Sequence, residues 1–248
     1  MTATRRARWP WVLLIIVAVV AVLVVAAEII ARAVLPSVVR GIVIEQLDLP
    51  ADQQIDVAAS GILLPQLIGG RLDELHLSSE KVTIGGITGS ADVTATAVPL
   101  QGGALGETRG TVAIDGRELE TLVARADLPI DSVEFAEPDV TVGGSIAILG
   151  ASIPVSLTVT PGADAGELLL TPVSASLAGN EIDLQQLAGR LGAVGEQLAA
   201  TQRICIADQL PAGITLTGLR IEGSRAVADI SADGRIAVDP ALLENGVC

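Results

Sequence analysis

The sequence predicts an α+β protein in which an antiparallel β-sheet and amphipathic helices follow an N-terminal transmembrane helix. Three observations lead to this fold class. An uninterrupted apolar run extends from Trp11 to Ala27, apolar and polar residues alternate through residues 54–100 and 133–177, and apolar residues recur at helical spacing between 183 and 200. Alternation of this length is typical of an antiparallel sheet with one buried face.

The apolar run is the first element. Three arginines precede it, and Ile29–Ala31 extend it to about the 20 residues that cross a bilayer. Positive charge before a span keeps that end in the cytoplasm, so the rest of the chain is expected to be exported. A signal peptide cleaved after Ala26-Ala27 is the alternative. The length of the run, and Trp9 and Trp11 at its start, favour an uncleaved signal-anchor. The expected division is a basic cytoplasmic tail at 1–10, a transmembrane signal-anchor at 11–31 and one extracytoplasmic domain at 32–248.

Two further helices are expected. The first is amphipathic, covers Val34–Leu47 directly after the anchor and ends at Pro50-Ala51-Asp52. The second extends from about Asp183 to Ala200, where three glycines weaken it. Its apolar stripe consists of Leu184, Leu187, Leu191, Val194 and Leu198.

Glycine pairs and loops separate the expected strands. Gly85-Gly86 and Gly89-Ser90 are interpreted as turns in the first block, and 162–166 as a loop in the second. Three aspartates each follow an expected strand and precede an expected helical turn, which predicts that they are N-caps rather than catalytic acids. These residues are Asp115, Asp183 and Asp239.

Charge and composition exclude some classes of function. Acidic residues outnumber basic ones 29 to 15, for a net charge of −14. This balance argues against nucleic-acid binding and against adsorption to anionic lipid by charge alone. Phe135 is the only aromatic residue beyond the N-terminal tryptophans. The interior must therefore be aliphatic, which suits acyl chains, although a compositional bias of the genome explains it equally well.

The sequence contains no complete motif for catalysis. Ser78–Lys81 matches S-x-x-K, but the partner motifs that this nucleophile requires do not occur, and the segment has strand periodicity. His76 is the single histidine. No metal site or cofactor is expected, because no Cys/His cluster, phosphate loop or dinucleotide motif is present. We expect a non-enzymatic protein, either a binding module or a structural protein of the envelope.

The cysteines are Cys205 and Cys248. Two lone cysteines in an exported chain predict one disulfide, which would fasten the C-terminus.

Two segments resemble the LmeA-like proteins of actinobacteria. Residues 61–75, GILLPQLIGGRLDEL, are similar to a signature that opens the exported domain of that family, with Leu where an aromatic residue is usual. Residues 205–214, CIADQLPAGI, are similar to its C-terminal segment. The resemblance implies a phospholipid-binding protein with a long curved antiparallel sheet wrapped around helices, as in tubular lipid-binding (TULIP) domains. It also implies support of mannan assembly on glycolipids in the envelope, with glycosyltransferases as partners.

The sequence-based hypothesis is therefore an anchored, extracytoplasmic protein that binds a phospholipid or glycolipid in a groove between sheet and helix. Arg71 is the candidate for the anionic headgroup, because a guanidinium presents a planar fork to phosphate. A surface ion pair with Asp73 or Glu74 is its alternative role. The alternative function is an envelope scaffold that binds proteins through an exposed apolar face. The expected lining residues are Ile62, Leu63, Leu64, Leu67, Ile68, Leu187, Leu191, Val194 and Leu198.

Overall fold

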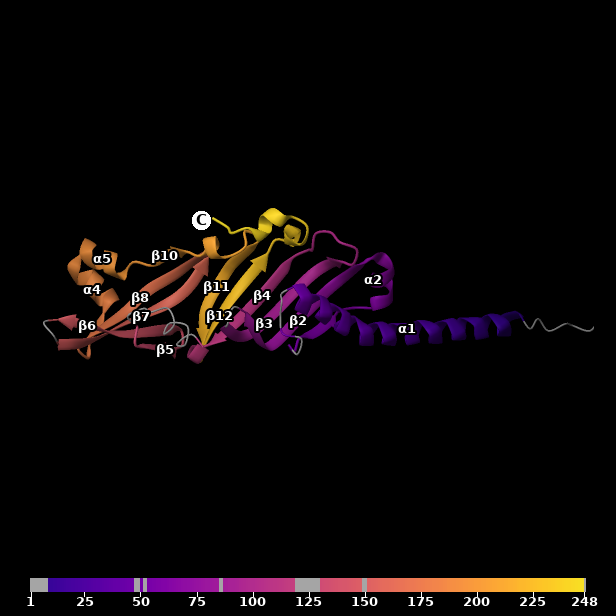
Figure 1. Cartoon of the computed structure of the whole chain (residues 1–248), viewed down its shortest axis with the longest axis horizontal. Helices are drawn as coiled ribbons and strands as arrows, with labels where there is room; N and C mark the ends of the chain where they lie inside the picture. Colours follow the sequence, from indigo (N-terminus) through magenta and orange to yellow (C-terminus); the bar gives the residue numbers. More distant parts are fainter. Residues whose placement is uncertain are drawn as a thin grey trace, which may run out of the picture.

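The molecule is a long helix that projects from an elongated, curved β-structure (Figure 1). The computed structural model describes residues 9–46, 50, 53–84, 87–118, 130–148 and 151–247. Helix α1, Trp9–Gln46, joins the predicted anchor and the predicted amphipathic helix without interruption. Pro36 lies inside it and costs one backbone hydrogen bond, but the apolar and small residues on both sides continue the helix.

The first sheet has six antiparallel strands in the order β1-β2-β3-β4-β12-β11. The first four strands follow one another in sequence, and the last two return from the C-terminal part of the chain. Their bounds are β1 Asp56–Ala59, β2 Arg71–Ile84, β3 Ile87–Pro99, β4 Thr108–Asp115, β11 Ile214–Glu222 and β12 Arg225–Ala232.

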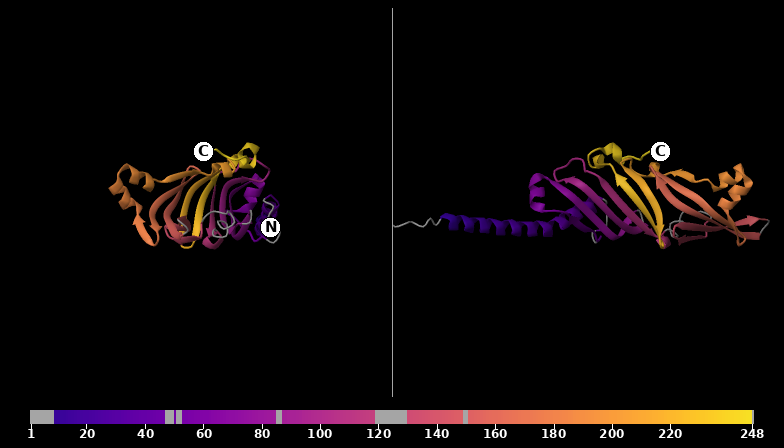
Figure 2. Two further views of the ribbon diagram at one scale, coloured as in Figure 1. Left: turned by 60° about the vertical axis from the view of Figure 1, so that its left-hand side comes forward. Right: turned by 180° about the vertical axis from the view of Figure 1, so that it is seen from behind.

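The second sheet has the order β10-β8-β7-β6-β5, with β9 paired to β8. It adjoins the first sheet at β7 and β11, where the amide of Gly166 donates to the carbonyl of Leu216 at 3.1 Å. The two sheets therefore continue one another along the long axis of the molecule (Figure 2). The bounds are β5 Ser132–Ala136, β6 Asp139–Ile148, β7 Ala151–Asp164, β8 Glu167–Leu177, β9 Asn180–Asp183 and β10 Gln202–Cys205.

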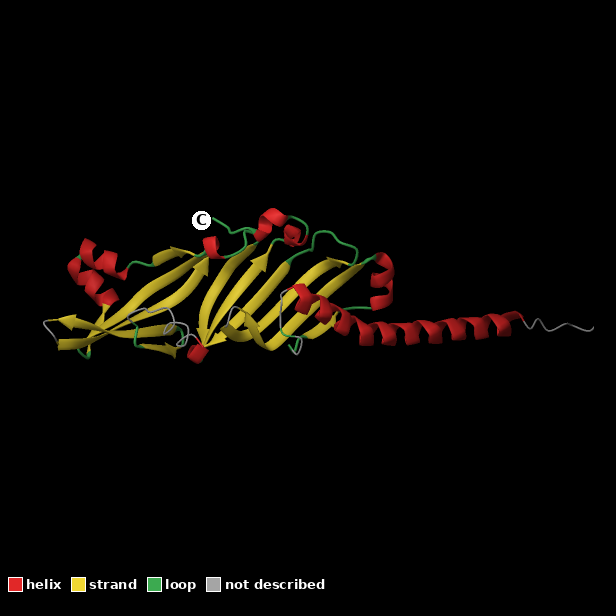
Figure 3. Cartoon of the chain, viewed as in Figure 1, coloured by secondary structure: helices red, strands yellow, loops and turns green. Residues whose placement is uncertain are grey.

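Short helices lie at the two ends of this surface and along one rim (Figure 3). Helix α2 lies beside α1, whereas α4 and α5 lie at the opposite end (Figure 1). Their bounds are α2 Leu63–Gly69, α4 Leu184–Leu191 and α5 Ala193–Ala199, with 3-10 turns η1 Ala207–Gln209, η2 Gly234–Ala237 and η3 Pro240–Leu243. The predicted α+β class with curved antiparallel sheets is confirmed at this level.

The predicted helix at 183–200 is two helices. Gly192 separates them with φ +59° and ψ −137°, a conformation that residues with a Cβ avoid. The apolar stripe in the sequence does not reveal this break, because the spacing of apolar residues does not depend on the backbone conformation of one glycine. The predicted start of the helix is correct, since the Asp183 carboxylate accepts a hydrogen bond from the amide of Gln186 at 3.0 Å. Asp239 caps η3 in the same way through the amide of Ala241.

One predicted turn is wrong, and one predicted loop is shorter than expected. Gly89-Ser90 lies inside β3, where the glycine permits close approach of β4: a Cβ on Gly89 would lie 2.6 Å from the carbonyl oxygen of Ala113. In the predicted loop at 162–166, β7 continues to Asp164, and only Ala165 and Gly166 form the turn, both at positive φ. Positive φ at both central residues is the geometry of a two-residue β-hairpin turn, so these two residues are sufficient to connect β7 to β8. Gly85-Gly86 lies outside the described residues.

Candidate functional site

The first sheet has one apolar face that crosses all six strands. Residues paired across neighbouring strands point to the same side of a sheet, so the register defines this face. One row consists of Val57, Leu77, Val93, Gly110, Ile230 and Leu216. The next row consists of Ala59, Leu75, Ala95, Thr108, Ala232 and Ile214.

The opposite face is polar along the same strands. One row of this face, next to the row of Val57 and Leu77, contains Asp56, Ser78, Asp92, Thr111 and Asp229. Asp92 contacts His76 Nε2 at 3.1 Å, and the Asp229 carboxylate accepts from the Thr111 hydroxyl at 3.1 Å. Water therefore suits this face, whereas the other face needs an apolar cover.

Helix α1 covers only the β1–β2 end of the apolar face. Its second half packs Ala31, Leu35 and Val39 against a core cluster formed by Leu63, Leu72 and Leu75. Further along, Val93 and Val112 on β3 and β4 and Ile230 on β12 are only half-buried. The helices and strands of the described part of the chain thus leave apolar side chains of this face partly accessible.

The second sheet continues the apolar character. Val142 on β6 pairs with Leu157 on β7, which is exposed, and Val155 pairs with the exposed Leu177. A cavity of about 240 Å³ opens here. It is lined by Ile130, Val142, Gly143, Gly144, Val155, Ser156 and Leu157.

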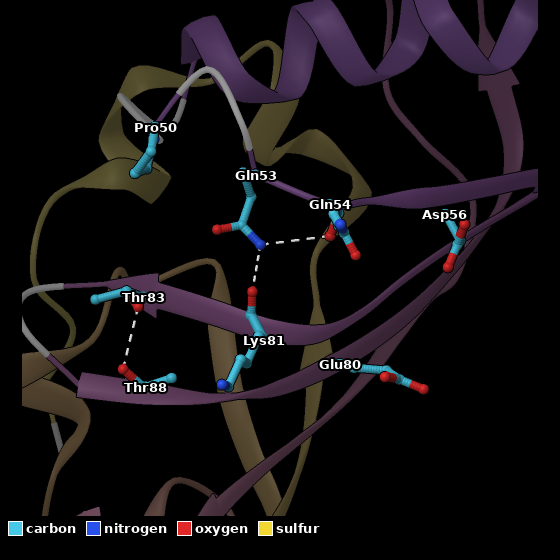
Figure 4. A pocket seen from close by; sticks show the side chains of 8 residues that line it. All are labelled: Pro50, Gln53, Gln54, Asp56, Glu80, Lys81, Thr83 and Thr88. Carbon is cyan, nitrogen blue, oxygen red and sulfur yellow. Dashed lines mark hydrogen bonds between the residues drawn. The ribbon is translucent and has the colours of Figure 1, made fainter.

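A larger cavity, of about 660 Å³, is polar (Figure 4). It lies beside Pro50, just beyond the C-terminal end of α1, and its other lining residues are Gln53, Gln54, Asp56, Glu80, Lys81, Thr83 and Thr88. The Gln53 amide donates to the Lys81 carbonyl oxygen, and the two threonine hydroxyls lie 3.1 Å apart. This lining suits a hydrated or polar group rather than an acyl chain.

The predicted lining residues of segment 62–68 are divided between core and surface. Leu63 is 2% exposed and belongs to the core cluster, while Leu64 and Leu67 are half-buried. Ile62 and Ile68 are 64% and 86% exposed. The segment is the short helix α2 at one end of the sheet, not one wall of a groove along it.

Arg71 is exposed at the start of β2. Within the described part of the chain it forms no ion pair with Asp73 or Glu74. Lys81, at the polar cavity, lies ten residues further along the same strand, which corresponds to about 33 Å. One lipid headgroup cannot contact both cations.

The other predicted wall lies at the far end of the molecule. Leu187 and Leu191 belong to α4, and Val194 and Leu198 to α5, but their side chains lie outside the described residues. Figure 1 places α4 and α5 at the end opposite α2. The structure therefore does not bring the two predicted walls together.

His76, and Ser79 next to the Ser78 of the S-x-x-K match, have structural partners. His76 Nδ1 lies 3.1 Å from the Thr94 hydroxyl, in addition to its contact with Asp92. The buried hydroxyl of Ser79 donates to the Gln54 carbonyl oxygen at 2.7 Å. These contacts tie β2 to its neighbours.

Cys205 ends β10, and Cys248 lies outside the described residues. The C-terminal tail runs close to the segment after Cys205, because the amide of Gly246 donates to the Leu210 carbonyl oxygen at 2.9 Å. The disulfide stays a prediction that this approach favours.

The LmeA-like phospholipid-binding family matches residues 26–228, more than four fifths of the chain. The chain belongs to this family. The match includes the second half of α1 and almost all of both sheets. Neither a curated protein nor a solved structure matches the chain.

The sequence interpretation missed the apolar face of β3, β4 and β12. The signal was present, because Val93 and Ile230 each lie between two polar residues, and Val112 follows a threonine. Alternation shows that a strand has an apolar side, but only the register shows that these sides form one surface.

Proposed function

We propose that this protein is a membrane-anchored, extracytoplasmic phospholipid-binding protein that holds acyl chains against the apolar face of its sheets. The observation that carries the proposal is an apolar face that continues beyond the cover of α1, in a chain of a phospholipid-binding family. Partly accessible aliphatic side chains are the environment that acyl chains prefer.

The anchor is the first half of α1. It is long and apolar enough to cross a membrane, and its side chains from Trp11 to Val25 are exposed. The arginines before it support a cytoplasmic N-terminus and an exported domain. A signal sequence would have the same composition, so topology needs its own test. Protease added to intact spheroplasts should degrade the domain, and a shortened mature chain would show that the anchor is cleaved.

The finer parts of the proposal rest on the resemblance to the family. They are a TULIP-like manner of lipid binding, a glycolipid as alternative ligand, a contribution to mannan assembly and cooperation with envelope glycosyltransferases. We propose no catalytic step, since the binding of lipid requires none.

The test is native mass spectrometry of the full chain purified in mild detergent, with lipid extraction as a second readout. We expect copurified phospholipid in the wild type. Ala91→Phe fills the apolar face between Ser79 and Val112, and should reduce the lipid carried. Ser90→Phe is the matched control, because the neighbouring residue points to the opposite face.

Retention of folding is verified for both variants by circular dichroism. Equal lipid content in the two folded variants would show that lipid does not occupy this face. A wild-type chain that carries no lipid would contradict the proposed function and favour the envelope scaffold, whose exposed apolar face binds protein instead.

A further inference from the structure

Helix α2 is joined to α1 by an unusual set of contacts. Its first residues have no side-chain cap of their own, and the carboxylate of Glu28 in α1 takes that role. The Glu28 oxygens accept hydrogen bonds from the amides of Leu63 and Leu64, each at 2.9 Å. Arg32, one turn further along α1, pairs with Glu28 at 2.9 Å and donates to the carbonyl oxygen of Gly61.

A second set of contacts fixes α2 to the sheet. The side chain of Gln66 is buried, donates to the Ser60 carbonyl oxygen at 2.9 Å and accepts from the amide of Asp73 at 3.0 Å. Leu63 adds apolar packing against the same region. Helix α2 is therefore fixed both to α1, through Glu28, and to the segments that flank it in the chain, through Gln66.

The length of the apolar run places this joint relative to a bilayer. The 17 positions from Trp11 to Ala27 correspond to about 26 Å of helix, close to the roughly 30 Å of a hydrocarbon core. Trp9 and Trp11 suit the interface at the cytoplasmic end. Glu28, the first charged residue after this run, then lies at the opposite interface, where Ile29–Ala31 complete the predicted anchor. Because Glu28 contacts α2 directly, α2 lies at the same depth.

The outward side of α2 is apolar. Ile62 and Ile68 are largely exposed. Leu100 is 39% exposed and lies next to the C-terminal end of α2, since its amide donates to the Gly70 carbonyl oxygen at 3.0 Å. We call these three residues the apolar tip. Four side-chain hydrogen bonds hold this seven-residue helix in place. The exposed isoleucines at its N-cap and near its C-terminal end are costly in water but favourable at a lipid surface.

We propose that the apolar tip inserts into the outer interface of the membrane that α1 crosses, so that one end of the apolar face opens directly at the lipid surface. This inference rests on the proposed function, because it requires α1 to span the membrane. Arg71 follows α2 by two residues and would then lie at the level of the lipid phosphates. A lipid could leave the leaflet and reach the sheet without crossing water.

The test uses tryptophan fluorescence of the full chain in phosphatidylcholine vesicles that contain lipid brominated near the top of its acyl chains. Trp9 and Trp11 are replaced by Phe, and Ile68→Trp provides the single probe. Ile182→Trp is the matched control, because Ile182 is also an exposed isoleucine but belongs to β9, which leads into α4 at the opposite end. We expect strong quenching and a blue-shifted emission for Ile68→Trp, and neither for Ile182→Trp.

Equal quenching of the two probes, in variants with wild-type circular dichroism, would overturn the inference. Ile62→Trp repeats the measurement at a second position of the tip. The unmodified chain, whose tryptophans are Trp9 and Trp11, tests the anchor separately. If these native tryptophans are quenched but the tip probe of the variant is not, only the inference is refuted. If the native tryptophans are not quenched, the membrane anchor is refuted.

Discussion

The clearest quantitative prediction concerns two apolar residues on the same short helix. Leu63 and Ile68 both belong to α2 and to the same predicted lipid-lining segment, yet Leu63 is 2% and Ile68 86% exposed. The structure therefore predicts a large loss of stability for truncation of Leu63 to alanine and almost none for truncation of Ile68. Leu63→Ala removes core packing, whereas Ile68→Ala removes a side chain that already lies outside the fold.

The magnitude follows from burial. Leu63→Ala deletes the equivalent of three methylene groups, at about 0.8 kcal/mol each, and the cavity left beside Leu72 and Leu75 adds to this loss. We expect the free energy of unfolding to fall by about 3 kcal/mol. For a chain of this size that corresponds to a decrease in Tm of about 6–12 °C. Ile68→Ala should change the free energy of unfolding by less than about 0.5 kcal/mol.

The assay is thermal unfolding of the full chain in detergent, followed by the circular dichroism of the β-sheet. Glu28 should still cap α2 in both variants, because its partners are backbone amides. The difference in Tm therefore reports the side chains alone. A Leu63→Ala variant as stable as Ile68→Ala would refute the placement of Leu63 in the core, and would return it to the set of candidate lipid contacts.

Three further predictions concern other parts of the chain. Thiol labelling of unreduced, denatured protein should find no free thiol if Cys205 and Cys248 form a disulfide. The disulfide would close the loop between these two residues, which contributes about 4 kcal/mol to the free energy of unfolding in the chain-entropy model, so reduction should lower Tm markedly. Gly189→Ala should raise the free energy of unfolding by about 0.5–1 kcal/mol, because an added Cβ contacts nothing at this position inside α4. Gly192→Ala should lower the free energy of unfolding by about 1–2 kcal/mol, because the residue has a positive φ. Equal effects of the two substitutions in chemical denaturation would argue against the helix break. Arg235 donates a hydrogen bond to the Asp233 carboxylate and lowers the pKa of that carboxyl from 3.8 to about 2. The stabilising contribution of this pair is therefore complete above pH 3.8 and is lost as the pH falls through about 2. A carboxyl carbon NMR titration of Asp233 with an unshifted midpoint would contradict this pairing.

Local patterns were sufficient for local features. The capping aspartates were predicted correctly because the interaction of a carboxylate with the amides two or three residues ahead involves only neighbouring residues. The strands around Val57, Leu75 and Val93 were predicted because alternation is a property of a single strand. The break at Gly192 was missed because a glycine in a helical pattern has no fixed conformation until its neighbours pack.

The candidate site shows the same division. By itself, the sequence determined the apolar helix at the N-terminus, the α+β class and the segments that resemble the family. Only the tertiary structure decided that segment 62–68 and the stripe after Leu184 lie at opposite ends, and that Glu28 joins α2 to α1. The reason is physical: strand register and helix docking depend on contacts between residues far apart in the chain, and periodicity specifies which side of an element is apolar but not which partner covers it.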